Sequence, residues 1–182
     1  SDHILMMMGV VERKMGHYEK AEEYLRELLE RGEAAGSRST VATASHHLAW
    51  LYINRGNLSQ ARLYCGKAIV LYDKIQDPRG ASDASEQLGL IALAEGKKEE
   101  AVTHLERSLD TRRTIGNQHG AASSLRHLAL AHLKFGHPLK AGIELLQSLH
   151  LYWTLGVLTR QRIRSIGREL LEWIFGQQRW TI

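Results

Sequence analysis

The chain has 182 residues, of which 43% are hydrophobic and 24% charged, so it is long and apolar enough to bury a continuous core. Its 24 basic and 20 acidic side chains leave a net charge of +4, an excess too small and scattered to argue for nucleic acid as a partner. The single cysteine, Cys65, excludes a disulfide framework and predicts a reducing, cytoplasmic compartment, and neither a signal peptide nor an apolar run of membrane-spanning length is visible.

Glycines divide the chain at a constant interval. Gly16, Gly56, Gly96 and Gly136 are 40 residues apart, and Gly176 continues the series. Each of the first four follows an apolar helical run and is followed by polar residues and an alanine that opens another such run. A strict period of this length predicts an array of helical hairpins. In such an array each of these glycines ends a helix in the left-handed conformation.

The residues between these glycines favour helix throughout, because the chain has only two prolines and no alternating apolar and polar runs. Ser37, Asp77 and Asn117 are good N-caps, and Pro78 suits the first position of a helix. We expect about nine helices, over residues 3–15, 18–35, 38–55, 58–75, 79–95, 98–115, 118–135, 139–155 and 159–175.

Small residues recur where the two helices of each hairpin must approach closely, at Gly9, Ala49, Gly89 and Ala129, and at Ala21, Ala61, Ala101 and Ala141. The phrase Leu88-Gly89…Gly96…Ala101 across a helix–turn–helix resembles the tetratricopeptide repeat (TPR). The resemblance covers essentially the whole chain and implies an all-α fold, a right-handed α-α superhelix of antiparallel hairpins. The expected repeats are residues 1–36, 37–76, 77–116 and 117–156, with a C-terminal half-repeat at 157–176. The period is 40, against ~34 in the common form of the family.

The helix junctions are similar to those of a narrower group. Segments such as 71–80 and 109–117 look like the 40-residue arrays of bacterial multidomain signalling and transcriptional regulators. That likeness implies that this region is a sensor or assembly part of a larger regulatory protein.

The two ends of the array differ in polarity. In the last expected helix, Arg168, Glu169 and Glu172 occupy the positions of Leu128, Ala129 and His132, which a following helix would cover. We therefore expect residues 159–175 to cap the array. The first helix is apolar at Ile4, Leu5, Met8 and Val11 and has no such polar face. We therefore expect that the array is cut at Ser1 from a longer one.

The resemblance implies that ligands bind on the first helices, which line the inside of the superhelix. Carried over residue by residue, the partner-binding groove contains a polar strip, Thr43, His46, Asp83, Glu86, Ser123 and Arg126, and an apolar strip, Trp50, Ile53, Leu90, Leu93, Leu130 and Leu133. Trp50 and Arg126 are of the types most often found as binding hot spots. Two alternatives stay open: part of the apolar strip is core between neighbouring first helices, and Glu86 only pairs with Arg126.

Catalytic and metal-binding interpretations find little support. The adjacent histidines His46 and His47 point in different directions on a helix, and a lone cysteine cannot form a zinc box. His47, Gln87 and His127 recur at the 40-residue period, which favours a polar ladder between repeats, and Cys65 falls at a core position. We expect neither catalysis, nor a metal, nor a cofactor.

Three functional hypotheses remain. In the first, the chain is a non-catalytic scaffold that binds a protein segment in its inner groove. In the second, the groove receives a short peptide or another small signal on behalf of a transcriptional regulator. In the third, the apolar strip joins two copies as a homodimer. None of the three requires direct contact with nucleic acid or membrane.

Overall fold

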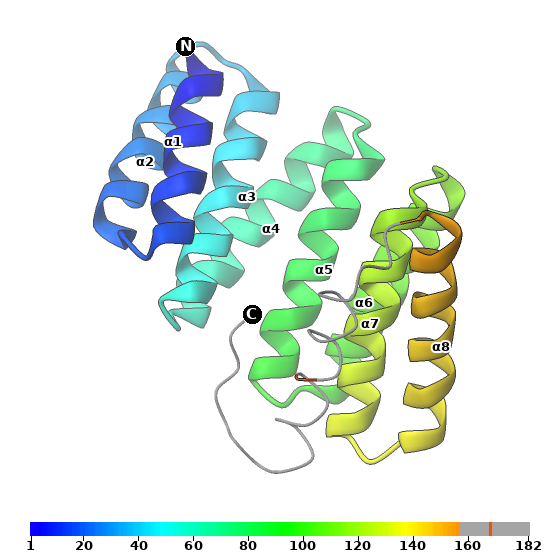
Figure 1. The fold of residues 1–182 in the computed structure, drawn as a ribbon. Helices are drawn as coiled ribbons and strands as arrows, with labels where there is room; N and C mark the ends of the chain where they lie inside the picture. Colours follow the sequence, from blue (N-terminus) through cyan, green and yellow to red (C-terminus); the bar gives the residue numbers. More distant parts are fainter. Residues whose placement is uncertain (157–167, 169–182) are drawn as a thin grey trace.

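The computed structural model describes residues 1–156 and Arg168, and consists there of eight helices in antiparallel pairs (Figure 1). They are α1 (Asp2–Met15), α2 (Tyr18–Ala34), α3 (Arg38–Asn54), α4 (Leu58–Lys74), α5 (Pro78–Ala94), α6 (Lys98–Thr114), α7 (Gln118–Lys134) and α8 (Pro138–Thr154). Each boundary lies within one residue of the expectation for that helix. The ninth helix, its cap and Gly176 lie outside the described residues, apart from Arg168, which is helical and exposed.

The turns are closed by the residues that the period singled out. Gly16, Gly56, Gly96 and Gly136 have φ between 73° and 84°, which is the left-handed region that glycine enters without steric cost. The expected caps are also confirmed, since the side chains of Ser37, Asp77 and Asn117 accept hydrogen bonds from the backbone N–H three residues later. Turns this short force each helix antiparallel to its predecessor.

The helices form two layers. We call α1, α3, α5 and α7 the inner helices, and α2, α4, α6 and α8 the outer helices. Each helix packs on its neighbours in sequence, and consecutive inner helices also approach one another along their backbones, which the outer helices of the described region do not. Because the inner helices are closer together, the stack curves and their layer is its concave side (Figure 1).

The core runs between the two layers. The small residues predicted at the crossing of each hairpin allow the two layers to pack closely. The alanines among them are completely buried: Ala21, Ala49, Ala61, Ala101, Ala129 and Ala141. A Cβ at Gly9 would lie 2.7 Å from the Leu25 side chain, and one at Gly89 would lie 2.6 Å from Leu105. Where the inner helix has Ala49 instead, the outer helix has the smaller Cys65. The crossing residues therefore match each other in size in the first three hairpins, whereas the fourth combines Ala129 with Leu145.

The joints between hairpins use different chemistry at equivalent positions. Between the first two hairpins, Arg55 Nη1 donates to Glu22 Oε2 at 2.6 Å. At the next joint the charges are exchanged, and Arg62 Nη2 donates to Glu95 Oε2 at 2.6 Å. At the third joint the equivalent residues, Val102 and Phe135, are both apolar and pack against the core.

Candidate functional site: the inner face and its buried ionic network

The inner helices contact one another with a constant offset. Four hydrogen bonds join residues that are 41 apart in sequence, one more than the repeat: Arg13–Asn54, His46–Gln87, Glu86–His127 and Leu93–Lys134. Each inner helix thus packs one face against the next inner helix. That face includes His46, Glu86 and Leu93, which the sequence predicts to line the groove.

As a result, none of the twelve predicted groove residues is fully exposed to solvent. Four are buried: Ile53, Glu86, Leu90 and Leu93. The other eight are half-buried: Thr43, His46, Trp50, Asp83, Ser123, Arg126, Leu130 and Leu133. Half of the apolar strip is therefore buried, whereas the polar strip, except for Glu86, reaches the surface.

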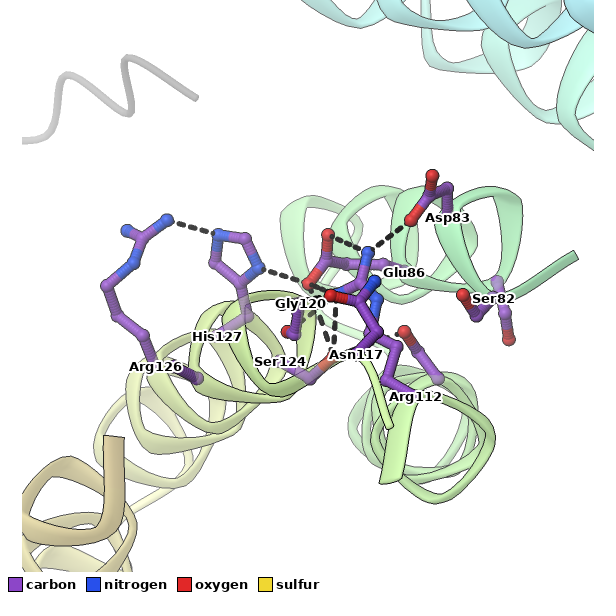
Figure 2. A network of polar contacts seen from close by, with 12 residues as sticks. Ser82, Asp83, Glu86, Arg112, Asn117, Gly120, Ser124, Arg126 and His127 are labelled. Carbon is purple, nitrogen blue, oxygen red and sulfur yellow. Dashed lines mark hydrogen bonds and ion pairs between the residues drawn. The ribbon is translucent and has the colours of Figure 1, made fainter. Parts of the chain in front are cut away.

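A buried arginine connects the polar residues of α5 and α7. Arg112 comes from the outer helix α6 and is only 4% exposed. Its Nη1 donates to Glu86 Oε1 at 2.6 Å, and its Nη2 donates to Asp83 Oδ1 at 2.6 Å and to Glu86 Oε2 at 3.1 Å. Nη1 also lies 3.0 Å from the Gly120 carbonyl and 2.8 Å from Ser124 Oγ. The guanidinium therefore fixes two carboxylates of α5 and the start of α7 (Figure 2).

Glycine 120 makes room for this arginine. A Cβ at Gly120 would lie 2.8 Å from Arg112 Cδ and 2.6 Å from Asn117 Nδ2. The previous joint is built in the same way, since a Cβ at Gly80 would lie 2.4 Å from the Tyr72 ring. Gly120 and Gly80 are 40 residues apart, and so are Arg112 and Tyr72, so the network occupies the volume that an aromatic ring fills one repeat earlier.

His127 links this buried centre to the surface. Its Nδ1 lies 3.0 Å from Glu86 Oε1, and Arg126 Nη2 lies 2.8 Å from its Nε2. Because a guanidinium can only donate, Nε2 is the acceptor and the imidazole hydrogen belongs on Nδ1, directed at the carboxylate. Glu86 and Arg126 are thus connected through His127 rather than paired directly, which corrects the expectation of a simple pair (Figure 2).

The network keeps Glu86 ionised although the side chain is buried. Burial raises the pKa of this carboxyl, but the contacts with His127 and then with Arg112 lower it by more, to about 2. Glu86 is therefore a buried anion with its charge balanced locally.

The polar ladder predicted from His47, Gln87 and His127 does not form, although two of the three residues bond to the preceding repeat. Gln87 Nε2 donates to the His46 carbonyl at 3.1 Å, and His127 reaches Glu86. No hydrogen bond joins His47, Gln87 and His127 to one another among the described residues, because the offset of 41 brings Gln87 against His46 and His127 against Glu86. His47 instead lies edge-to-face with His46, with 5.1 Å between the ring centroids.

His46 and His47 are half-buried neighbours on α3, close to Arg13 of α1. Among the described residues, the Nδ1 atoms of both rings are buried and have no hydrogen-bond partner. Burial, together with the nearby Arg13 guanidinium, lowers the pKa of His46 to about 4 and that of His47 to about 3. Both rings are therefore neutral at physiological pH.

Because His46 and His47 have lowered pKa values, we expect the free energy of unfolding of the chain to fall in mild acid. Their pKa is lower in the folded than in the unfolded chain, so their effect is absent above ~6.5 and grows as pH falls from 6.5 towards 4. The His47→Gln variant should lose less stability than the parent chain between pH 7 and 4.5, by about 1–2 kcal/mol. Urea titrations at a series of pH values measure this difference. The matched variant His150→Gln, at an exposed site on α8, should follow the parent curve, and identical curves for all three proteins would contradict the prediction.

Cys65 is a core residue, as its position suggested. It is completely buried, its Sγ lies 2.9 Å from the Ala84 carbonyl, and burial raises the pKa of the thiol to about 12. Across residues 1–156 and 168, no group of three histidine, cysteine, aspartate or glutamate residues is arranged to hold a metal ion. No helix in that part of the chain is both long and apolar enough to cross a membrane.

Fold and site together define the class: a solenoid of helical hairpins whose inner helices present a polar, internally braced concave face. Family models described as tetratricopeptide repeat match residues 2–74 and 82–114, more than half of the chain. The chain belongs to the tetratricopeptide repeat family. This fold generally mediates protein–protein interaction, and the family generally consists of non-catalytic scaffolds.

Solved structures show the same fold. BtubC (BKLC) from P. vanneervenii superimposes with a TM-score of 0.75 and 16% identity, over 87% of this chain and 65% of that one. A Podosopora anserina putative kinesin light chain with nearly identical TPR-like repeats superimposes with a TM-score of 0.69 and 16% identity, over 97% and 96% of the two chains.

A curated relative comes from Streptomyces griseus. Its regulatory protein AfsR is 32% identical over 107 residues, which are 59% of this chain. The chain spans only 11% of the length of AfsR.

Proposed function

We propose that the chain is a non-catalytic scaffold that binds a protein segment across the concave face of α3, α5 and α7, as part of a larger regulatory protein. The observation that carries this proposal is the braced polar face. Asp83, whose side chain is 40% exposed, and Arg126 reach the concave surface from opposite ends of a network that is buried at its centre. Side chains already held in place lose little conformational freedom when a partner binds them.

The same face offers apolar contacts beside the charges. Trp50 is half-buried and lies under the Arg13 guanidinium, whose carbon is 5.9 Å from the ring centroid, and Leu130 and Leu133 are half-buried on α7. Because half of the expected apolar strip is buried, the partner that fits is a mixed segment: a few apolar anchors with a basic side chain near Asp83.

The regulatory context is supported by the relative's description. AfsR is described as a regulatory protein, and this chain matches a part of it that is 11% of its length. That proportion is consistent with an assembly or sensor region within a multidomain chain.

Peptide display against the chain tests the proposal. A library of random peptides should yield binders that bind at least ~10-fold more weakly to the Trp50→Ala and Leu130→Ser variants, because both remove concave contacts. The control Leu63→Ser, at a leucine 65% exposed on the convex side of α4, should bind as the parent does. Thermal unfolding of all variants separates loss of binding from loss of folding. Binders that depend on Leu63 and not on Trp50 or Leu130 would refute the concave site.

A further inference from the structure

Arg13 is a cation at a position that is apolar in the other inner helices. Its equivalents are Ile53 and Leu93, which are 6% and 4% exposed, and the half-buried Leu133. Arg13 is itself half-buried, and its guanidinium carbon lies 5.9 Å from the centroid of the Trp50 ring. A charge in such a place costs free energy unless an opposite charge balances it.

No carboxylate of the described residues forms an ion pair with Arg13. Its Nη1 donates to Asn54 Oδ1 at 3.2 Å, and its Nε is buried without a hydrogen-bond partner among those residues. The nearby imidazoles of His46 and His47 are neutral, as their lowered pKa values require, so they supply no negative charge. Arg13 is thus a partly desolvated cation whose charge the described chain does not balance.

Arg112 is the contrasting case. Burial lowers the pKa of Arg112, but its contacts with Glu86 and then with Asp83 raise that pKa by more, so it ends above its ordinary value. Burial also lowers the pKa of Arg13, and there no carboxylate reverses the effect. Both arginines replace residues that are apolar or aromatic in other repeats, but only Arg112 has its acidic partners within the array.

An inner helix packed before α1 would not balance Arg13. At this level of the stack, the residue that meets the preceding inner helix is the next one along, as Asn54 shows on α3 and Lys134 on α7. Its equivalent on α1 is Lys14. Arg13 lies instead on the side of α1 that faces α3, as its contacts with Asn54 and Trp50 show, and both helices of that contact are present.

We propose that Arg13 binds an acidic side chain of the protein segment that occupies the concave face. This assignment rests on the proposed function, and it adds an acidic residue at the α1 end of the groove to the basic residue expected near Asp83. Charge complementarity favours this occupant, because an unpaired guanidinium lies beside the apolar Trp50 ring and is already oriented by Asn54. The segment lies across the inner helices with its acidic part at α1 and α3 and its basic part at α5.

The Arg13→Leu variant separates a role in binding from a role in the fold. Leucine is the equivalent residue in the third and fourth hairpins, so the variant should melt no more than about 3 °C below the parent chain. Thermal unfolding followed by circular dichroism measures the difference. A larger fall would show that Arg13 serves the packing of α1 on α3, and would overturn the proposal.

Peptides from a random display library are the probe for binding. Those that bind more weakly to Leu130→Ser occupy the concave face, and they should contain an aspartate or glutamate whose change to the amide weakens binding to the parent chain at least ~10-fold. Arg13→Leu should bind the original peptide at least ~10-fold more weakly, and the amide peptide no more weakly still. The control Lys14→Gln, at the exposed neighbour of Arg13, should bind as the parent does.

The outcomes distinguish this assignment from the proposed function. Binders that depend on Leu130 but not on Arg13, or that lose as much affinity in Lys14→Gln as in Arg13→Leu, overturn the assignment and leave the concave site in place. If no binder depends on Leu130, the concave site itself is refuted and the assignment of Arg13 is refuted with it.

Discussion

Replacing Arg112 with methionine is expected to lower the free energy of unfolding by about 3–5 kcal/mol. Methionine fills much of the space but leaves Glu86, only 6% exposed, without its guanidinium partner. The carboxylate then has to stay ionised in the interior with only His127 and the Ser124 hydroxyl as partners, or take up a proton, and both cost free energy. For a chain of this size the melting temperature should fall by about 10 °C. Urea and thermal denaturation followed by circular dichroism measure both quantities.

Two further variants test whether the unpaired Glu86 carboxylate causes the loss of stability. Arg113→Met changes the neighbouring, exposed arginine of the same helix and should alter stability by no more than about 0.5 kcal/mol. Glu86→Met in the Arg112→Met background removes the unpaired charge and should recover part of the loss. A loss below about 1 kcal/mol for Arg112→Met would show that water screens the network and that it does not hold the concave face in place.

When the crossing residues of one hairpin are replaced by those of another, we expect the effects of the two substitutions on the free energy of unfolding to be strongly non-additive. Gly89→Ala should cost about 1–2 kcal/mol, because the new Cβ would lie 2.6 Å from Leu105 Cγ and 3.2 Å from the Ala101 carbonyl, and the better helix propensity of alanine offsets only part of the strain. Leu105→Cys should cost about 2–3 kcal/mol through the cavity it leaves. The double variant, which copies the Ala49–Cys65 pair of the preceding hairpin, should cost about 2 kcal/mol less than the sum of the single changes.

A double-mutant cycle in urea measures that coupling. Gly142→Ala is the matched control, because Gly142 is an exposed helical glycine whose added Cβ would meet no atom within 4 Å. It should raise stability by about 0.5–1 kcal/mol. Additive effects of Gly89→Ala and Leu105→Cys would mean that the hairpin adjusts its helix separation freely, and size matching would then not specify the crossing.

The helices could be predicted from the sequence because their ends depend on local chemistry. A glycine in the left-handed conformation or an Asx cap acts within one turn, so the repeat of Gly16, Gly56, Gly96 and Gly136 was sufficient to place boundaries within a residue. The close crossings could be predicted equally well, because two helix backbones approach closely only where the residue between them is small, as at Ala49 and Ala129.

The exposure of the groove could not be predicted from residue types, because it depends on the angle between successive hairpins. The offset of 41 lays Glu86 against His127 and Leu93 against Lys134. A different angle would have left the same residues open. Family resemblance identified the face, and the packing of the inner helices decided how much of it is accessible.

Arg112 was missed because it belongs to an outer helix, whereas the sequence analysis placed all candidate site residues on the inner helices. A signal was present: the equivalent residues Tyr72 and Tyr152 are aromatic, and an arginine at such a position needs a buried acceptor. Asp83 and Glu86, about one turn apart, are the two carboxylates of α5, the inner helix of the same hairpin. A charged residue at a position that is apolar in the other repeats should therefore be tested for an oppositely charged partner before it is predicted to be exposed.

The joints between hairpins have a consequence for how the array can change. Glu22 meets Arg55, but Arg62 meets Glu95, so a duplicated second hairpin would place Arg62 of one copy against Arg55 of the next. A copy of the first hairpin inserted elsewhere would likewise meet the wrong neighbour in size or charge. Although all hairpins share one backbone geometry, they are not interchangeable parts. An engineered array therefore keeps its joint contacts when adjacent hairpins are transferred together, and a simple tandem duplication brings like charges together at the new joint.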